Sequence, residues 1–361
     1  MADMKIKEVA GKSDIDKELE EILTKQRTKI KVFGVGGAGN NSLSRMKEVG
    51  IKGAEMIAVN TDAQDLLYTN SDHKILIGRQ LAQGSGAGSN PKVGEDSARE
   101  SENEIKQKLE GSNMVFVTCG LGGGTGTGAA PVIAEIANKM GVLTIGVVTL
   151  PFTIEGQKRY ENAVYGLERL EDLVDTLIVI PNDKLLELAP ELPLHTAFKV
   201  ADEILTNSVK GITELVTKPG LVNLDFADIK AVMSGGGVAM IGVGESDSQK
   251  GRAIEAVQKA IENPLLDVKV DGATGALINI IGGNDMSLQE AKEVIETVNK
   301  KLSPDARLIW GAQINDDMDK TIKVLLIVTG VRSSQIFGQG EKMSGKKRTE
   351  ISGELGIEFV E

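Results

Sequence analysis

Short runs of β-branched and aliphatic residues alternate with helical stretches over the first half of the chain. The runs are apolar on both faces, which predicts strands that are buried on both sides. The intervening segments have the three- and four-residue apolar spacing of amphipathic helices. The predicted strands are Ile30–Gly34, Met56–Asn60, Lys74–Ile77, Met114–Thr118, Leu143–Thr149 and Leu177–Ile180, and the predicted helices lie near residues 40–49, 92–110, 128–140 and 156–172. This alternation predicts a parallel sheet covered by helices on both faces.

One long helical pattern follows, from about Leu194 to Thr217, and Pro219-Gly220 ends it. Apolar residues recur along it at three- and four-residue steps, at Leu194, Phe198, Ala201, Leu205, Val209, Ile212 and Val216. Beyond it the pattern predicts a second, α+β unit. Its expected strands are Val238–Val243, Ala276–Ile281, Arg307–Ala312 and Thr321–Gly330, with helices at 248–262 and 287–302.

The patterns divide the 361 residues into five parts. Residues 1–27 form a polar extension, in which Ile15, Leu19, Ile22 and Leu23 predict a small amphipathic helix. The α/β domain spans 28–193, the central helix 194–220 and the second domain 221–332. Residues 333–361 lose apolar periodicity and are predicted to be a flexible tail.

Composition narrows the function. A formal charge of −11 disfavours broad contact with nucleic acid. One cysteine and two histidines cannot build a disulfide or a Cys/His metal cage, so Cys119 is expected to be a buried apolar residue in a cytosolic protein. The uncharged stretch 111–134 is too rich in glycine to span a membrane, and the first eight residues lack the apolar core of a signal peptide. The 42 glycines are more than composition averages predict, so their clusters mark the candidate site.

The first glycine cluster runs from Gly34 to Gly39, directly after a predicted strand and at the start of a helix. Gly34, Gly36 and Gly39 match G-x-G-x-x-G, in which glycines let backbone N–H groups approach a phosphate at a helix N-terminus. The alternative is a tight turn that only allows the helix to pack on the strand. Taken alone, the cluster does not tell which nucleotide would bind.

The second cluster, Gly120–Gly128, also follows a strand and also opens a helix. Two such loops predict two backbone cradles on one polyphosphate, whereas a dinucleotide oxidoreductase normally needs only the first. The lysine-bearing loop G-x-x-x-x-G-K-[ST] is absent here. The negative charge of the polyphosphate is therefore expected to be neutralised by helix termini, backbone amides and a metal ion.

These residues resemble the tubulin and FtsZ superfamily of GTPases, whose signature is Gly122-Gly123-Gly124-Thr125-Gly126-Thr127-Gly128. Within that superfamily the chain resembles the prokaryotic cell-division branch, the FtsZ family, in an archaeal form. The resemblance covers roughly residues 29–330. Further matching segments are Asn60-Thr61-Asp62, residues 148–159 from Val148 to Arg159, Phe198-Lys199-Val200-Ala201-Asp202 and Asn223-Leu224-Asp225-Phe226-Ala227-Asp228.

The resemblance implies a Rossmann-like GTPase domain, a long central helix and a second α+β domain. It also implies GTP or GDP as ligand with Mg²⁺. Phosphate and nearby contacts would come from the two glycine loops, at Gly36, Gly37, Ala38, Gly39, Asn40, Asn41, Gly123, Gly124, Thr125, Gly126 and Thr127. Glu155 and Arg159 would contact the ribose and phosphate region, Asn41, Asn162 and Asp202 would read the guanine, and Phe198 would pack on the base.

Chemistry supports the role of Asp202. A carboxylate accepts two hydrogen bonds from N1–H and the N2 amino group of guanine, and adenine offers no such donors, so the pairing rejects the wrong base. Without the surrounding motifs, a solvated helix residue would be the simpler interpretation.

Asn223, Asp225 and Asp228 form a polar cluster just past the long helix. From spacing alone, a loop with a helix N-cap explains them. However, Asp202 and Thr217 lie about 20–25 Å apart along one helix, so the cluster cannot reach the nucleotide of its own subunit. The resemblance implies that it completes the GTPase site of a neighbour stacked head to tail, a contact that generates filaments.

Two other functions remain as alternatives. An NAD-dependent oxidoreductase would use Gly34–Gly39 but would leave the second loop and the Asn223–Asp228 cluster unexplained. A superfamily member acting in cell shape or DNA partition would share every motif. The tail ends in Ile357-Glu358-Phe359-Val360-Glu361 and lacks the terminal peptide of bacterial relatives. We therefore expect it either to bind a membrane-anchoring adaptor at the division site or to pair with the second domain.

Overall fold

The computed structural model describes residues 28–188, 193–218, 220–222, 224–263, 265 and 273–331, with only the backbone for 186–188, 194 and 195. The predicted helix around Ile15–Leu23, the tail 333–361 and Asn223 lie outside these residues.

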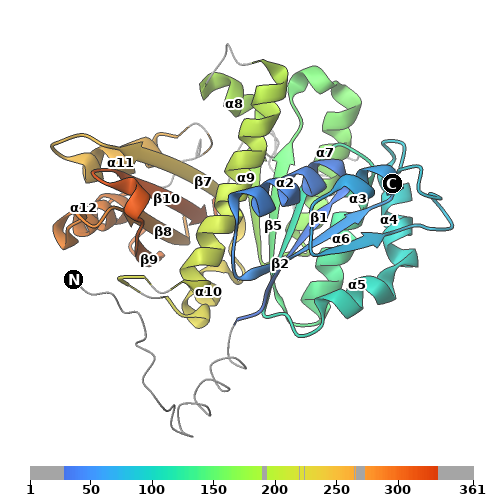
Figure 1. Cartoon of the computed structure of the whole chain (residues 1–361), viewed down its shortest axis with the longest axis horizontal. Coiled ribbons are helices and arrows are strands. Elements are labelled where there is room, and N and C mark those ends of the chain that lie inside the picture. The colour runs from blue at the N-terminus through green and yellow to red at the C-terminus, as the bar shows by residue number, and fades with distance from the viewer. Residues whose placement is uncertain are drawn as a thin grey trace, which may run out of the picture.

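A ten-stranded sheet runs through both halves of the molecule in the order β3-β2-β1-β4-β5-β6-β7-β10-β8-β9 (Figure 1). The strands of the first half pair in parallel: β1 Ile30–Val35, β2 Ala54–Asn60, β3 His73–Leu76, β4 Met114–Gly120, β5 Leu143–Leu150 and β6 Thr176–Pro181. The chain winds outward in one direction from β1 to β3 and in the other from β4 to β6. The strand order therefore reverses between β1 and β4, where ligands bind in sheets of this kind.

Helices cover both faces of this half. They are α2 Gly36–Val49, α3 Ala63–Tyr68, α4 Pro91–Glu100, α5 Glu102–Leu109, α6 Thr125–Lys139, α7 Gln157–Glu171 and α8 Asn182–Leu188. Phe33 belongs to a buried cluster that includes α6, whereas Val32 belongs to a second cluster on the side of α2. Every residue of β5 is buried. The predicted parallel sheet with two covered faces is confirmed.

Two helices begin earlier than the sequence predicted. The expected starts near residues 40 and 128 ignore the glycine clusters, but α2 begins at Gly36 and α6 at Thr125. The later glycines of each cluster, such as Gly36 and Gly126, thus lie in the first helical turn, whereas Gly122–Gly124 remain a loop ahead of α6. The predicted helix 92–110 is divided at Ser101 into α4 and α5. The helices α3, α8 and α10 (Phe226–Met233) were not predicted, because six to eight residues are too few to show a period.

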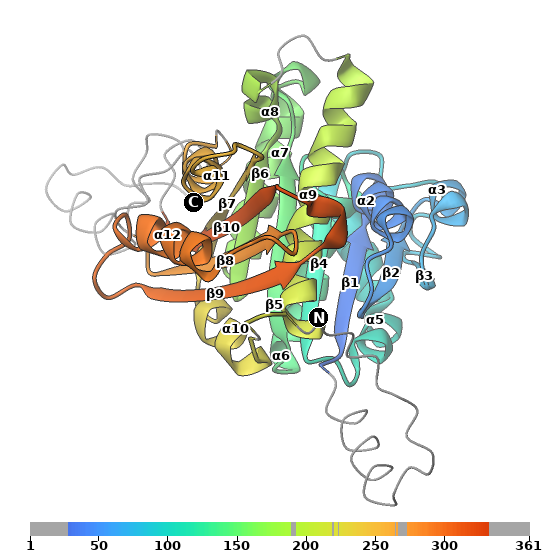
Figure 2. The ribbon, with the colours of Figure 1, turned by 60° about the vertical axis from the view of Figure 1, so that its left-hand side comes forward.

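The long helix α9, Leu194–Thr217, has the predicted bounds and runs between the two halves (Figures 1 and 2). Its 24 residues give a length of about 36 Å at 1.5 Å per residue. Its buried residues Leu205, Val209 and Ile212 pack into the cluster on the α2 side of the sheet.

The second half contributes β7 Gly237–Ser246, β8 Gly275–Gly282, β9 Arg307–Ile314 and β10 Ile322–Thr329, with α11 Arg252–Ile261, α12 Leu288–Asn299 and the short 3₁₀ turn η4 Asp316–Met318. Strand β10 is antiparallel to both β7 and β8, while β9 is parallel to β8. The halves join where Thr176–Ile178 of β6 pairs in parallel with Gly237–Ala239 of β7. Hydrophobic periodicity alone did not predict this continuity.

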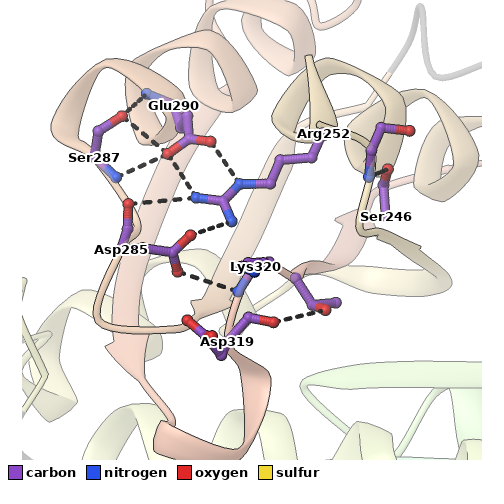
Figure 3. A network of polar contacts seen from close by, with 9 residues as sticks. Ser246, Arg252, Asp285, Ser287, Glu290, Asp319 and Lys320 are labelled. Carbon is purple, nitrogen blue, oxygen red and sulfur yellow. Dashed lines mark hydrogen bonds and ion pairs between the residues drawn. The ribbon is translucent and has the colours of Figure 1, made fainter. Parts of the chain in front are cut away.

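A charged network fastens the helical layer of the second half (Figure 3). Arg252 of α11 is 9% exposed and donates from Nε to Glu290 Oε1 at 2.7 Å and from its terminal nitrogen to Asp285 Oδ2 at 2.6 Å. The backbone N–H of Lys320 donates to the other oxygen of Asp285. The hydrogen bond from Arg252 holds the pKa of Glu290 below its usual value. The guanidinium therefore ties α11 to α12 and to the loop after β8, and Asp285 links that loop to the turn before β10.

Candidate functional site

A cavity of about 560 Å³ opens at the carboxyl ends of β1, β4 and β5, at the point where the strand order reverses. Among the predicted contact residues, its lining includes Gly36, Gly37, Ala38, Asn41, Gly123, Gly124, Thr125, Gly126, Glu155, Arg159, Phe198 and Asp202. The structure thus brings both glycine loops and the N-terminal part of α9 to one site.

The first glycine loop leads straight into α2. The residue before the helix, Val35, makes no side-chain cap, and the first turn holds no acidic residue, so the first N–H groups of α2 remain available to an anion. Gly36 has a φ of +72°, and a Cβ there would lie 2.9 Å from the backbone nitrogen of Gly126. Only glycine allows the two loops to approach this closely.

The second loop repeats the arrangement at α6. Gly124 precedes the helix without a side-chain cap, and this first turn also lacks acidic residues. A Cβ on Gly124 would lie 2.9 Å from the backbone nitrogen of Asn90, so this loop packs tightly against the segment after β3. Two uncapped helix N-termini therefore face one cavity, an arrangement suited to the negative charge of a polyphosphate.

Four predicted contact residues do not line the cavity. A Cβ on Gly39 would lie 2.5 Å from the carbonyl oxygen of Thr118, so Gly39 serves the close packing of α2 on β4. Thr127 Oγ1 accepts a hydrogen bond from the Gly122 N–H at 2.9 Å. Asn40 is fully buried and donates to Asp65 Oδ2 at 3.1 Å. These residues shape the loops around the cavity.

Asn162 is the fourth, and its amide is used by the protein itself. Its Nδ2 donates to the carbonyl oxygen of Ser89 at 3.1 Å and to that of Gly122 at 3.2 Å. The side chain is 8% exposed and holds the second glycine loop against the segment after β3. It lies outside the lining, and the base contact that the resemblance implies for Asn162 stays a prediction.

The sequence analysis missed Asn182, the first residue of α8. It lines the cavity, is 5% exposed, and its Oδ1 is buried without a hydrogen-bond partner among the described residues. A buried acceptor left unpaired indicates a missing donor. No pattern around Asn182 distinguishes it from other residues that follow a buried strand.

A third glycine cluster was also missed, although the sequence carries a signal for it. Gly84-Ser85-Gly86-Ala87-Gly88 lies in the segment between β3 and α4. Gly86, Ala87 and Ser89 line the cavity. This segment after β3 therefore lines the cavity together with the two glycine loops.

Two carboxylates lie beside the first loop. Asp62 caps α3 by accepting from the Gln64 N–H at 2.9 Å, and Asp65 Oδ2 accepts from Asn60 Nδ2 at 2.6 Å. Both Asp62 and Asp65 line the cavity. Within the described ranges, no group of three or more acidic, histidine or cysteine side chains could hold a metal by itself. Mg²⁺ commonly uses one or two carboxylates together with phosphate oxygens and waters, and this donor set fits that requirement.

The far end of the cavity carries Asp202 and Phe198 of α9. Asp202 Oδ1 accepts from Ser42 Oγ at 2.8 Å, and burial raises the pKa of Asp202 despite the opposing effects of Ser42 and Arg45. The Phe198 ring is 40% exposed and contacts Phe152 edge to face at 5.1 Å. A half-exposed aromatic ring next to a partly desolvated carboxylate suits a planar base that has hydrogen-bond donors on its edge.

Glu155 and Arg159 form an ion pair at the rim of the cavity. Glu155 also accepts from the backbone N–H of Phe152 at 2.9 Å. Cys119 lies in β4 just before the second loop, where burial raises the pKa of its thiol to about 12, so it serves as a buried apolar residue as expected.

Asp225 and Asp228 do not reach this cavity. They cap α10 reciprocally, because the Asp228 N–H donates to Asp225 Oδ1 at 2.8 Å and the Asp225 N–H donates to Asp228 Oδ2 at 3.3 Å. Both side chains are exposed. Helices α8 and α10 lie near opposite ends of α9 in both views (Figures 1 and 2). Asp225 and Asp228 therefore do cap a helix, as their spacing alone indicated. The carboxylate oxygens that the cap does not use face solvent.

No helix in the part of the chain that the structure describes is long and apolar enough to cross a bilayer.

Comparison with known proteins gives consistent matches over nearly the whole chain. The family model described as the Tubulin/FtsZ family GTPase domain matches residues 29–190, and that of the FtsZ family C-terminal domain matches residues 237–332. The chain is 62% identical over 337 residues to "Cell division protein FtsZ 1" of Thermococcus kodakarensis, covering 93% of this chain and 90% of that protein.

Solved structures agree. An empty FtsZ dimer from Methanocaldococcus jannaschii is similar with a TM-score of 0.84 and 58% identity, covering 88% of this chain and 93% of that one. A GTPγS-bound CetZ2 protofilament from Haloferax volcanii is similar with a TM-score of 0.75 over 91% of this chain and 100% of that one. At 22% identity, the second likeness shows the fold alone.

Proposed function

The chain belongs to the FtsZ branch of the Tubulin/FtsZ family and is a guanine-nucleotide-binding GTPase of the cell-division cytoskeleton, and from this premise we propose that two subunits stacked head to tail build its hydrolytic site. One subunit holds GTP in the cavity between the glycine loops. The next subunit supplies Asp225 and Asp228, and Asn223 with them. Hydrolysis then depends on self-assembly into a filament.

The separation of the two sets of residues along α9 carries this proposal. Asp202 lines the nucleotide cavity, and Thr217 ends the helix about 22 Å away at 1.5 Å per residue. The Asp225–Asp228 cap follows that far end and is exposed. The nucleotide end of one subunit can therefore meet the carboxylate end of the next. A head-to-tail contact of this kind leaves both outer ends of the pair free, so further subunits can be added and a filament forms.

The proposed chemistry follows from the charges. The uncapped N-termini of α2 and α6 would hold the β- and γ-phosphates, and Arg159 lies at the same rim. The exposed oxygens of Asp225 and Asp228 would orient a water for in-line attack on the γ-phosphate. A bound Mg²⁺, held by Asp62 or Asp65 and by phosphate oxygens, would neutralise charge on the phosphates. Breaking the bond to the γ-phosphate removes a link between subunits.

Base selection is proposed to rest on Asp202, with Asn41 beside it and Phe198 packing on the ring. The unpaired Oδ1 of Asn182 supplies a further acceptor inside the same cavity. We assign this base contact to Asn182 in preference to Asn162, because Asn162 does not line the cavity and its Nδ2 already donates to two loop carbonyls.

The remaining proposals concern location and partners. The solved FtsZ dimer of the M. jannaschii relative supports self-association of this chain. We place the protein in the cytoplasm at the division site, without contact to nucleic acid because of its charge of −11. An adaptor bound to the tail 333–361 would connect the filament to the membrane.

A mixing experiment tests the shared site. Asp225→Asn combined with Asp228→Asn keeps the helix cap, because asparagine caps as well as aspartate, and removes both charges. Gly37→Asp puts a negative charge beside the phosphates. Gly37 is exposed with a nearest contact of 3.9 Å, so the substitution has room and suits a helix start.

The Asn pair is expected to bind GTP without turnover, and Gly37→Asp to bind none. Mixed, the two variants should recover phosphate release, because the nucleotide of one then meets the loop of the other. Phosphate release and co-pelleting are measured together. A mixture that co-assembles and yet stays as inactive as its components would contradict the shared site, as would first-order turnover by dilute monomer.

A further inference from the structure

A second cleft, of about 270 Å³, lies between the C-terminal half of α9 and the strands of the second half. Figure 2 shows this part of α9 behind β8, β9 and β10. The lining of the cleft comprises Asn207, Lys210, Gly211, Glu214, Lys218, Asn279, Ile281, Gln313, Ile314, Asn315, Met318, Lys323 and Leu325. None of these residues belongs to the nucleotide cavity.

The strand register explains why this cleft is polar. Lys323 of β10 pairs with Ile281 of β8, and Ile281 pairs with Gln313 of β9, so their side chains form one row across the sheet. Asn279 lies in the next row on the same face, between Leu325 and Gly311. Elsewhere this face is apolar and packs on α9, as Leu277 and Ile327 do. Beside the cleft the face is instead polar.

Two buried polar atoms in the cleft lack hydrogen-bond partners among the described residues. Asn279 is 1% exposed and its Oδ1 is unpaired, and Gln313 is 8% exposed and its Nε2 is unpaired. A buried amide without a partner costs free energy, so such groups are normally satisfied. The cleft therefore presents one unused acceptor and one unused donor.

The charges are also unbalanced. Lys218 pairs with Glu214 at 2.6 Å, but no ion pair of the described chain involves the ammonium group of Lys210 or that of Lys323. Glu245 lies opposite Lys323 on β7, is exposed, and makes no ion pair with it. Three ammonium groups and one carboxylate thus line a cleft in a chain whose formal charge is −11. The excess of positive charge is local and unneutralised.

We propose that this cleft binds a small oxyanion that also carries a hydroxyl group, as a hydroxy-polycarboxylate or a phosphate ester does. Lys210 and Lys323 neutralise the anion from opposite walls, and the Gln313 Nε2 group donates to one of its oxygens. The hydroxyl group donates to Asn279 Oδ1. A bound ligand would join α9 to the sheet of the second half.

Binding can be measured by calorimetry on the full chain with the nucleotide cavity saturated by GDP, so that anions do not occupy the phosphate cradle. The probes are citrate, glycerol 3-phosphate and tricarballylate, which is citrate without its hydroxyl, at constant ionic strength set with chloride. Citrate or glycerol 3-phosphate should bind saturably at one site. Tricarballylate should bind more weakly than citrate. Whichever of citrate and glycerol 3-phosphate binds more tightly identifies the ligand class.

Variants locate the site. Lys323→Ala and Lys210→Ala should each weaken binding by about tenfold to a hundredfold, as expected for losing a charged hydrogen bond. Lys323→Arg should retain much of it. Lys292→Ala, which removes an exposed lysine of α12, is the matched control and should not change affinity. Unchanged GDP binding and circular dichroism verify that each variant is folded.

Two results would overturn the proposal. One is the absence of saturable binding by all three probes up to about 10 mM, a concentration above the weak end of small-ligand affinities. The other is equal affinity of the parent and Lys323→Ala. Either result would leave the GTPase proposal untouched, because the nucleotide cavity is filled throughout.

Discussion

At the scale of single residues, the proposed base contact depends on one carboxylate, that of Asp202, whose negative charge is costly because the group is partly buried. Asp202 is partly desolvated, and a single hydroxyl group, that of Ser42, donates to one of its oxygens. Its remaining acceptor capacity is left for a ligand. A group that is poorly satisfied in the free protein can gain more when the correct base supplies the missing donors.

Replacing this carboxylate should affect both affinity and selectivity. We expect Asp202→Ala to weaken GTP binding by roughly 1.5–3 kcal/mol and to reduce discrimination against ATP, because hydrogen bonds to a charged acceptor are lost. Glu203→Ala removes the neighbouring exposed carboxylate of the same helix and serves as control. Titration with fluorescent GTP and ATP analogues measures both effects. Equal GTP affinity in the parent and Asp202→Ala would remove Asp202 from the base site.

The raised pKa of Asp202 also predicts a pH dependence. Because burial raises it, Asp202 takes up a proton at a higher pH in the folded, nucleotide-free protein than in the unfolded chain. The buried charge is a cost to folding at high pH, and that cost disappears as the pH falls through the raised pKa. Guanine needs the charged form, so GDP affinity should fall over the same acidic range. Asp202→Asn should abolish this part of the profile, and its persistence in Asp202→Asn would assign it to another group.

The residue scale is also where reasoning from sequence alone was least complete. Asp202 and Phe198 were placed in the cavity by motif. Asn162 lies in the second turn of α7 and Asn182 is the first residue of α8, and only the hydrogen-bond pattern shows that Asn162 fastens two loops while Asn182 has an unused acceptor. A motif fixes the order of residues along the chain, whereas the direction of a side chain depends on the three-dimensional packing of elements around it.

At the scale of elements, the cavity is made by helix starts. Helices α2 and α6 begin inside their glycine clusters, without side-chain caps, at the ends of adjacent strands. A serine or aspartate side chain at these positions would accept hydrogen bonds from the first N–H groups of the helix and so compete with a ligand. The missing caps are therefore part of the binding site.

Comparing two glycines that have nearly equal φ values distinguishes the cost of backbone strain from the cost of a clash between the two loops. Gly36 has a φ of +72° and touches the second loop, whereas Gly50, at the end of the same helix, has a φ of +74° with nothing within 4 Å. We expect Gly50→Ala to cost only the strain of a left-handed residue, about 1–2 kcal/mol in unfolding free energy. Gly36→Ala should cost more and should abolish nucleotide binding, because the loops must separate.

Denaturant unfolding and GDP titration of Gly36→Ala and Gly50→Ala measure these effects. If Gly36→Ala loses no more stability than Gly50→Ala and still binds GDP, the contact between the loops is not needed for the cradle.

The length of a helix decided whether it could be predicted from the sequence. The 24-residue helix α9 shows its period over several turns and was predicted with its observed bounds. Helix α10 has eight residues, and its start is marked by the same Asp225 and Asp228 that were singled out for chemistry. The pairing of β6 with β7 had no local signal, because it involves three residue pairs from strands that lie far apart in the chain.

At the scale of the whole molecule, the two ends of α9 have different chemistry, and this gives the subunit a direction. The nucleotide cavity and the Asp225–Asp228 cap lie toward opposite ends. Because both surfaces of the proposed contact lie outside residues 333–361, we expect the subunit to assemble without the tail.

The tail can therefore be tested apart from assembly. Removing residues 351–361 should leave GTPase activity and pelleting of filaments unchanged while abolishing recruitment to the membrane in cells, as imaged with a tagged protein. Ile357 and Phe359 would form the apolar contacts with the adaptor. A lower melting temperature, or failure to polymerise, would instead assign the segment to the folded domain and place the adaptor elsewhere.

The junction between β6 and β7 has a consequence during synthesis. Strand β6 ends at Pro181 and its partner begins at Gly237, so about 55 residues must leave the ribosome before β6 gains its second neighbour. At ~5–20 residues per second, this takes roughly 3–11 s. Throughout that time a buried, apolar strand is an open edge on an otherwise complete half-sheet, which is a template for wrong pairing. The newborn chain is thus most exposed to aggregation in this interval, and a chaperone that shields β6 would act between the emergence of α8 and that of β7.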